Sequence, residues 1–285
     1  MGRQRAKDTA YPQARLSDGI AEIRPAEFES GFEVIVDGTP QSHVDLTDPT
    51  HLAFEYVARM GAVIDQLPDG PITAVHLGAG GLTIPRFIAA TRPGSRQQVV
   101  EIEQPLVDLV REHLPLPNGA PIRVRIGDAR DGLKRMPPAM RGNVDLLVSD
   151  VYSGAQTPAH LTTTEFYREA ADLLSPTGIL LVNVADGAGL AFARRQAATV
   201  QAVLPHLAIL AEVQVLKGRR FGNLVFAASA RPMPTEWLPR LMAAGPHPAK
   251  IAEGAEVDRF ISGALPVVDG AAAASPKPSL SLFDR

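Results

Sequence analysis

The sequence predicts an α/β protein with a mostly parallel sheet, and three observations support this. Apolar, strand-like segments alternate with helical patterns over most of the 285 residues, the order expected of a parallel sheet covered by helices on both faces. Two more strand-like segments follow close together, which predicts an antiparallel pair at the sheet edge. A β-hairpin pattern precedes the first helix.

Residues 1–50 are expected to form this N-terminal β-hairpin region. Strand-like stretches cover 19–25 and 32–46, and "DGTP" within the second supplies a turn between alternating residues. The stretch 48–67 then predicts a helix. Asp48 is its expected cap, Pro49 suits the first turn, and apolar residues recur at helical spacing.

Residues 51–231 are expected to form the main domain. Its predicted helices include 105–114, 163–174 and 192–204, and its predicted strands are 72–77, 97–102, 122–127, 145–150, 179–185, 210–216 and 223–229. Five parallel strands followed by an antiparallel pair give the seven-stranded, Rossmann-like sheet of the methyltransferase-type fold. Residues 232–285 are expected to add helices near 235–244 and 249–262, then a flexible tail from 269 rich in alanine, serine and proline.

The composition excludes several classes of function. A net charge of −3 provides no basic field for nucleic acid or anionic membranes. The absence of cysteine removes disulfides, thiolate zinc sites and cysteine nucleophiles. No pair among the seven histidines has the spacing of a helical metal motif, so we expect no metal site. The first residues lack the apolar core of a secretory signal and no apolar run could span a membrane, so a cytoplasmic protein is expected.

Ligands of such sheets bind beyond the carboxyl ends of the strands, so the residues that end each strand matter most. The first strand ends in Gly78-Ala79-Gly80-Gly81, where glycines permit a sharp turn and close approach to a ligand. The second ends in Glu101, about twenty residues after the glycines, where a carboxylate can accept hydrogen bonds from both ribose hydroxyls. A capping role at the strand–helix junction is the alternative for Glu101.

Two more strand ends carry aspartates. Asp128, which follows Gly127, can accept from the exocyclic amine of an adenine or can cap the next helix, and both roles are compatible. Asp150 ends the fourth strand, where it is either a proton acceptor or a cap of the following loop. A nicotinamide protein would explain the first two strand ends only, and Thr83 stands where the last glycine of its motif would fall. An adenosyl-sulfonium cofactor accounts for all four.

With these motifs in this order, the chain resembles the spermidine synthase family of polyamine aminopropyltransferases, and in particular a divergent bacterial branch. The resemblance covers roughly residues 30–230. It rests on "DGTPQS", "GAGG", "VEIE", "IGDA" and "SDVYSG" followed by "EFY". It implies a role in polyamine biosynthesis, in which decarboxylated S-adenosylmethionine donates an aminopropyl group to a small-molecule amine.

The resemblance also implies roles for individual residues. Glu101 would bind the ribose and Asp128 the adenine amine, and Gln41 would contact the cofactor from the hairpin. Gly78, Gly80, Gly81 and Ala129 complete the expected cofactor site. Asp150 matches the family's proton acceptor. An ammonium group must lose a proton before it attacks carbon, and a carboxylate at the strand end can hold the amine and accept that proton.

Departures from the family pattern leave the substrates open. Gly81 replaces an aspartate that holds the donor amine, and in "DVYS" Ser153 stands where the family has a second acid. Tyr152, Ser153 and Arg219 are the substrate contacts that the resemblance implies. A tyrosine that the family carries in its first helix aligns only loosely near "HLAFEY", where Tyr56 is the candidate. Arg219 or Arg220 replaces a second pocket tyrosine. Two arginines would repel a dicationic polyamine and suit a carboxylate or phosphate, although a solvated hairpin tip explains them equally well.

Two further functions therefore remain open. Methyl transfer from intact S-adenosylmethionine is one, because that cofactor carries its own carboxylate where the family aspartate is lost. Arg86, one helical turn on, could approach this carboxylate, although a solvated position is the simpler expectation. The other is a non-catalytic nucleoside-binding protein. A different nucleophile could also replace the amine, and a homodimer is left open.

Overall fold

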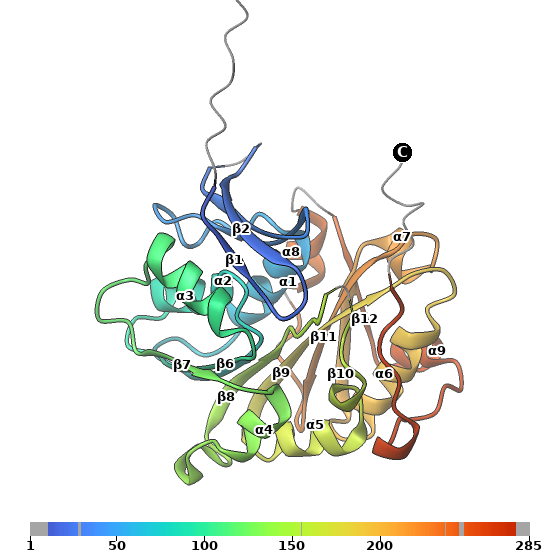
Figure 1. Ribbon diagram of the computed structural model, residues 1–285. Coiled ribbons are helices and arrows are strands. Elements are labelled where there is room, and N and C mark those ends of the chain that lie inside the picture. Colours follow the sequence, from blue (N-terminus) through green and yellow to red (C-terminus); the bar gives the residue numbers. More distant parts are fainter. Residues whose placement is uncertain (1–10, 28–29, 155, 237, 245–247, 278–285) are drawn as a thin grey trace, which may run out of the picture.

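The computed structural model describes residues 11–27, 30–154, 156–236, 238–244 and 248–277. Figure 1 shows two sheets, a small antiparallel one near the N-terminus and a large twisted one with helices on both faces. In the described part of the chain, no helix combines the length and the apolar character needed to cross a bilayer.

The small sheet has four strands in the order β1-β2-β3-β4. They are β1 (Gln13–Arg15), β2 (Ile20–Pro25), β3 (Phe32–Val36) and β4 (Thr39–Val44). The turn between β3 and β4 has positive φ at Asp37 and Gly38, which matches the right-handed twist of a tight hairpin. Apolar residues of this sheet pack on helix α3 (Gln104–His113) of the main domain, so the hairpin region lies against the large sheet's carboxyl edge.

The large sheet has eight strands in the order β12-β10-β11-β9-β8-β5-β6-β7. The parallel strands are β5 (Thr73–Leu77), β6 (Arg96–Glu101), β7 (Ile122–Ile126), β8 (Val144–Ser149) and β9 (Leu174–Asp186), and the antiparallel ones are β10 (His206–Ala211), β11 (Gly222–Ser229) and β12 (Lys250–Glu253). The predicted fold class is confirmed.

Three expectations about individual elements are wrong. The sheet has eight strands rather than seven, because β12 pairs with β10 from a segment predicted as helix. The strand predicted at 210–216 begins earlier and ends at Ala211, and the polar Glu212 starts the short helix α7 (Val213–Leu216). The helix predicted from Asp48 begins only at Glu55, because the Asp48 carboxylate closes a local turn with Thr50.

Helices cover both faces of the sheet and bury it from solvent. One face packs against α1 (Glu55–Ile64), α2 (Thr83–Thr91) and α8 (Leu238–Ala244). The other packs against α4 (Ala129–Lys134), α5 (Thr164–Ala171), α6 (Ala191–Gln201) and α9 (Ala255–Ile261). Because both faces are covered, the carboxyl edge of the parallel strands is where a ligand can reach the sheet.

Residues 267–275, the C-terminal strap, are bonded to the main domain, although a flexible tail was expected from 269. The Val267 carbonyl accepts from the amide and the hydroxyl of Thr164, and the Val267 amide donates to the Thr199 hydroxyl. Asp269 pairs with Arg130 at 2.8 Å. Ser275 is 1% exposed, and its hydroxyl accepts from the Thr157 amide at 2.8 Å. Sequence composition missed these contacts because each uses a side chain distant in sequence; residues 278–285 lie outside the described part.

The ends of β5 and β8 are joined by an unusually close backbone approach. The Asp150 amide donates to the Leu77 carbonyl at 2.9 Å. Gly78 follows with φ of +87°, and a Cβ atom there would lie 2.2 Å from the Asp150 carbonyl oxygen. Glycine is therefore required at position 78 both for its backbone conformation and for the space it leaves.

We expect Gly78→Ala to destabilise the protein by about 2–4 kcal/mol, from left-handed backbone strain and the clash with Asp150. Gly94→Ala is the matched control, because Gly94 has the same φ of +87° but a Cβ atom there would lie 3.7 Å from the Pro71 side chain, an ordinary contact distance. Denaturant unfolding should show a loss of only about 1–2 kcal/mol for the control. Equal losses in the two variants would mean that the close approach to Asp150 is not the constraint.

Candidate active site at the carboxyl ends of the strands

A cavity of about 280 Å³ lies where the parallel strands end against the small sheet; it is called the strand-end cavity below. Most of the residues that the sequence singles out line it: Gln41, Gly78, Gly80, Glu101, Asp128, Asp150, Tyr152 and Ser153. Three do not, namely Gly81, Ala129 and Arg219. The predicted residues meet in one cavity because the parallel strands of the sheet bring together strand ends that are far apart in sequence.

The glycine turn after β5 is held by side chains from two other elements. The Ala79 amide donates to a Glu101 carboxylate oxygen at 2.8 Å, and the Gly81 amide donates to the Ser42 hydroxyl at 3.0 Å. A Cβ on Gly81 would lie 2.7 Å from Val44. Gly81 therefore serves the packing of the turn against β4, which is why it does not line the strand-end cavity.

Glu101 is 8% exposed at the end of β6. Besides Ala79, its carboxylate accepts from the Glu103 amide at 2.9 Å, so the side chain fixes both the glycine turn and the start of α3. Each oxygen accepts one of these hydrogen bonds and keeps further acceptor capacity. The role of ribose ligand therefore remains a prediction that this geometry permits.

Asp128 caps α4, which is one of the two compatible roles that the sequence predicts for it. Its Oδ1 accepts from the Arg130 and Asp131 amides, and its Oδ2 lies 2.8 Å from His160 Nε2. Burial alone would raise the pKa of Asp128, but the amide of Asp131 and the His160 ring lower it overall. His160 also lines the cavity, and no motif in the sequence indicated it. The adenine contact remains a prediction, while Ala129 is buried in the first turn of α4 and faces the core.

Asp150 is held by two side chains rather than by the amides of its own loop. Tyr56 donates its hydroxyl to Asp150 Oδ2 at 3.1 Å, and Asn183 donates its side-chain amide to Oδ1 at 2.9 Å. The amide of Ser153 instead donates to the Gln156 carbonyl. Burial raises the pKa of Asp150 above its usual value, and the bonds from Asn183 and Tyr56 oppose this rise. These contacts differ from those of a loop cap, and they orient a half-buried carboxylate.

The two partners of Asp150 differ in how far the sequence indicated them. Tyr56 was a candidate of uncertain alignment, and α1 directs it at the strand end. Asn183 was missed, although it is a single amide within the apolar run "ILLVNVA". Burial raises the pKa of Tyr56 and of Tyr152 far above the ordinary tyrosine value. Both phenols are therefore protonated at neutral pH.

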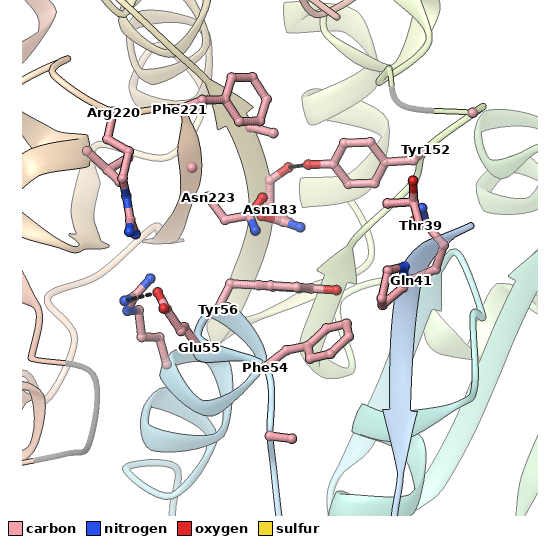
Figure 2. A pocket seen from close by; sticks show the side chains of 17 residues that line it. Thr39, Gln41, Phe54, Glu55, Tyr56, Tyr152, Asn183, Arg220, Phe221 and Asn223 are labelled. Atoms are coloured by element: carbon pink, nitrogen blue, oxygen red, sulfur yellow. Dashed lines mark hydrogen bonds and ion pairs between the residues drawn. The ribbon is translucent and has the colours of Figure 1, made fainter. Parts of the chain in front are cut away.

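A second cavity, of about 530 Å³, adjoins the first and is called the arginine cavity (Figure 2). Gln41, Tyr56, Tyr152 and Gly154 line both cavities. In Figure 2, Arg220 and Glu55 lie on the side away from Gln41 and Tyr152. Of the two arginines at the tip of the β10–β11 connection, Arg220 lines the cavity, whereas Arg219, the expected substrate contact, lines neither cavity, and its amide donates to the Gln214 carbonyl. The difference is a one-residue shift after Gly218.

Arg86 does not approach the strand-end cavity, and the expectation of a solvated side chain is wrong as well. It is 3% exposed. Its guanidinium donates to backbone carbonyls of Gly81, Leu114 and Pro115. Arg86 therefore holds the glycine turn through the Gly81 carbonyl, on the side away from the cavity. The sequence does not distinguish a buried arginine of this kind from a solvated arginine on a helix.

Comparison with known proteins gives a consistent picture. No protein-family model matches the chain. A polyamine aminopropyltransferase from Chromobacterium violaceum is 29% identical over 183 residues, which are 64% of this chain and 65% of the relative, so the match spans slightly less than two thirds of that curated relative's length.

Solved structures extend this likeness. The crystal structure of a probable spermidine synthase from Corynebacterium glutamicum aligns with a TM-score of 0.82 at 30% identity, over 90% of this chain and 96% of that one. Human methyltransferase-like protein 13 in complex with SAH aligns with a TM-score of 0.55 at 19% identity, over 76% of this chain and 96% of that one. The latter likeness concerns the fold alone.

Proposed function

Because the chain belongs to the spermidine synthase-like family, we propose that it is an aminopropyltransferase whose donor is decarboxylated S-adenosylmethionine and whose acceptor is an amine. One observation carries the proposal: Asp150 lines the strand-end cavity, and the two side chains that fix it, Tyr56 and Asn183, line the adjoining arginine cavity. The strand-end cavity would take the donor nucleoside, and the arginine cavity would take the acceptor.

The charge of the strand-end cavity supports a cationic donor. Among its described lining residues there is no lysine or arginine, whereas five carboxylates line it: Asp18, Glu101, Glu103, Asp128 and Asp150. The only basic side chains in this described lining are His76 and His160, and burial lowers the pKa of His76 to about 4. An acidic cavity favours a sulfonium with a free ammonium group.

The same cavity gives little support to intact S-adenosylmethionine, the donor that methyl transfer requires. A carboxylate on the donor would need a cation or free backbone amides. Arg86 faces away, and the amides of Ala79 and Gly81 are taken by Glu101 and Ser42. We therefore favour the decarboxylated donor, in spite of the loss of the family aspartate at Gly81.

In the proposed reaction, Asp150 orients the acceptor ammonium and accepts one of its protons. The nitrogen lone pair then attacks the methylene carbon next to the sulfonium. The carbon–sulfur bond breaks with its electron pair on sulfur, which releases methylthioadenosine. Because this is an in-line displacement, much of the acceleration should come from positioning, and the two side chains that fix Asp150 serve that purpose.

The test of this function is the release of methylthioadenosine with the decarboxylated donor and a panel of primary amines. Asp150→Asn keeps the size of the side chain but removes the proton acceptor, so turnover should fall roughly 100-fold or more while methylthioadenosine still binds. Intact S-adenosylmethionine is the donor control, assayed both for methylthioadenosine and for the S-adenosylhomocysteine that methyl transfer would release. A variant rate close to that of the wild type, or a preference for the intact donor, would contradict the proposal.

Glu101→Gln should weaken the binding of methylthioadenosine by about 1–3 kcal/mol, the scale of hydrogen bonds to a charged group. Glu103→Gln is the matched control, because the Glu103 carboxylate is engaged by the amide and hydroxyl of Ser17. Calorimetric titration should show a smaller loss for the control. Unchanged affinity in Glu101→Gln would remove this residue from the ribose site.

Tyr56→Phe should move the acid limb of the kcat/KM profile to higher pH. Burial already raises the pKa of Asp150 and the Tyr56 hydrogen bond lowers it, so loss of this bond raises the pKa further. Because the base acts only when deprotonated, the variant should lose activity first at low pH and recover it as pH rises. A limb that stays in place or moves to lower pH would show that Asp150 does not set it.

A further inference from the structure

The side of the arginine cavity away from Gln41 and Tyr152 carries a group of charged side chains that the proposed reaction does not use. Arg59 and Glu55 form an ion pair at 3.1 Å on α1. Arg220 pairs with Glu212 across the short helix α7. Glu55, Arg59 and Arg220 line the cavity but Glu212 does not, so the charges that face the cavity sum to about +1.

Arg59 is the buried member of this group. It is 4% exposed, and its Nε atom has no hydrogen-bond partner among the described residues. Burial lowers the pKa of Arg59 from its usual value, and the neighbouring Arg220 acts in the same direction, while Glu55 and Glu212 oppose them. A buried guanidinium beside a second guanidinium favours an additional anion.

The two ends of the arginine cavity therefore differ in charge. On the side toward the strand-end cavity, the lining residues Tyr56 and Asn183 both donate to the Asp150 carboxylate, which lies just behind them in the strand-end cavity. At the opposite side lie Arg220 and Glu55 (Figure 2). A diamine bound across the cavity would place one ammonium toward Asp150 and the other beside two guanidinium groups. Glu55, the one carboxylate among the described residues of this lining, is already paired with Arg59.

We propose that the acceptor is an amine with an anionic group, a carboxylate or a phosphate, at its other end. The amine would face Asp150, and the planar guanidinium forks of Arg59 and Arg220 would bind the anion. This inference rests on the proposed function and specifies its acceptor. The product would be a secondary amine that retains the anion, formed by the same displacement and the same loss of one proton.

The test compares acceptors that are matched in length and differ in the far end. For chains of three to six carbons, methylthioadenosine release would be measured with the ω-amino acid, the α,ω-diamine and the alkylamine, and aminoalkyl phosphates would form a fourth arm. We expect kcat/KM for an anionic acceptor to exceed that for the matched diamine and alkylamine by at least about tenfold, the scale of one charge-assisted hydrogen bond.

Arg220→Gln removes one fork from a side chain that is 53% exposed, so the variant should fold. It should lower kcat/KM for the anionic acceptor about tenfold or more and leave the alkylamine rate nearly unchanged. Arg220→Glu should move the preference toward diamines. Lys217→Gln is the matched control, because Lys217 is an exposed cation on the same connection that lines neither cavity.

The outcomes separate this inference from the proposed function. Methylthioadenosine release that is fastest with diamines, or equal for all far ends, would overturn the anionic acceptor and leave the aminopropyltransferase intact. Anion preference that is unaffected by Arg220→Gln would overturn the assignment to the arginine cavity. If none of the amines in any arm supports the release of methylthioadenosine, the proposed function itself is overturned.

Discussion

The contact on which the site depends is the backbone approach between Gly78 and Asp150. Parallel pairing brings the ends of β5 and β8 together, and the Asp150 amide bonds to Leu77. Because position 78 has no side chain, the glycine turn can fold directly over the Asp150 carbonyl. One constraint thus fixes the distance between the turn that would hold the nucleoside and the carboxylate that would accept the proton.

The small N-terminal sheet closes the strand-end cavity that the strand ends of the large sheet form in part. Ser42 holds the Gly81 amide, Thr83 donates to the His43 carbonyl, and Ser17 engages Glu103. These bonds join β4 and the β1–β2 turn to the starts of α2 and α3. The strand-end cavity is therefore enclosed partly by the small N-terminal sheet and partly by the strand ends of the large sheet, and neither sheet alone would form it.

The strand ends were predictable from the sequence because parallel topology makes their meeting obligatory. Glu101, Asp128 and Asp150 were found in this way, without any knowledge of their contacts. What the sequence could not supply are the contacts that depend on side-chain direction. Arg86 turns to backbone carbonyls, and Arg220 rather than Arg219 lines a cavity. The added strand β12 also escaped prediction, because four residues of modest β character pair only when β10 offers an open edge.

The C-terminal strap affects when the loop after Asp150 becomes fully supported during synthesis of the chain. Residues Gln156 and Thr157, in the loop that follows Asp150, bond to Ser275, which lies 119 and 118 positions later in the chain. A ribosome makes the chain from its N-terminus, so this loop emerges long before its anchor. The sheet strands around Asp150 can pair beforehand, but the loop that carries Tyr152 and Ser153 receives its last supports only when the strap arrives. The proposed site is therefore completed only after the strap has been synthesised.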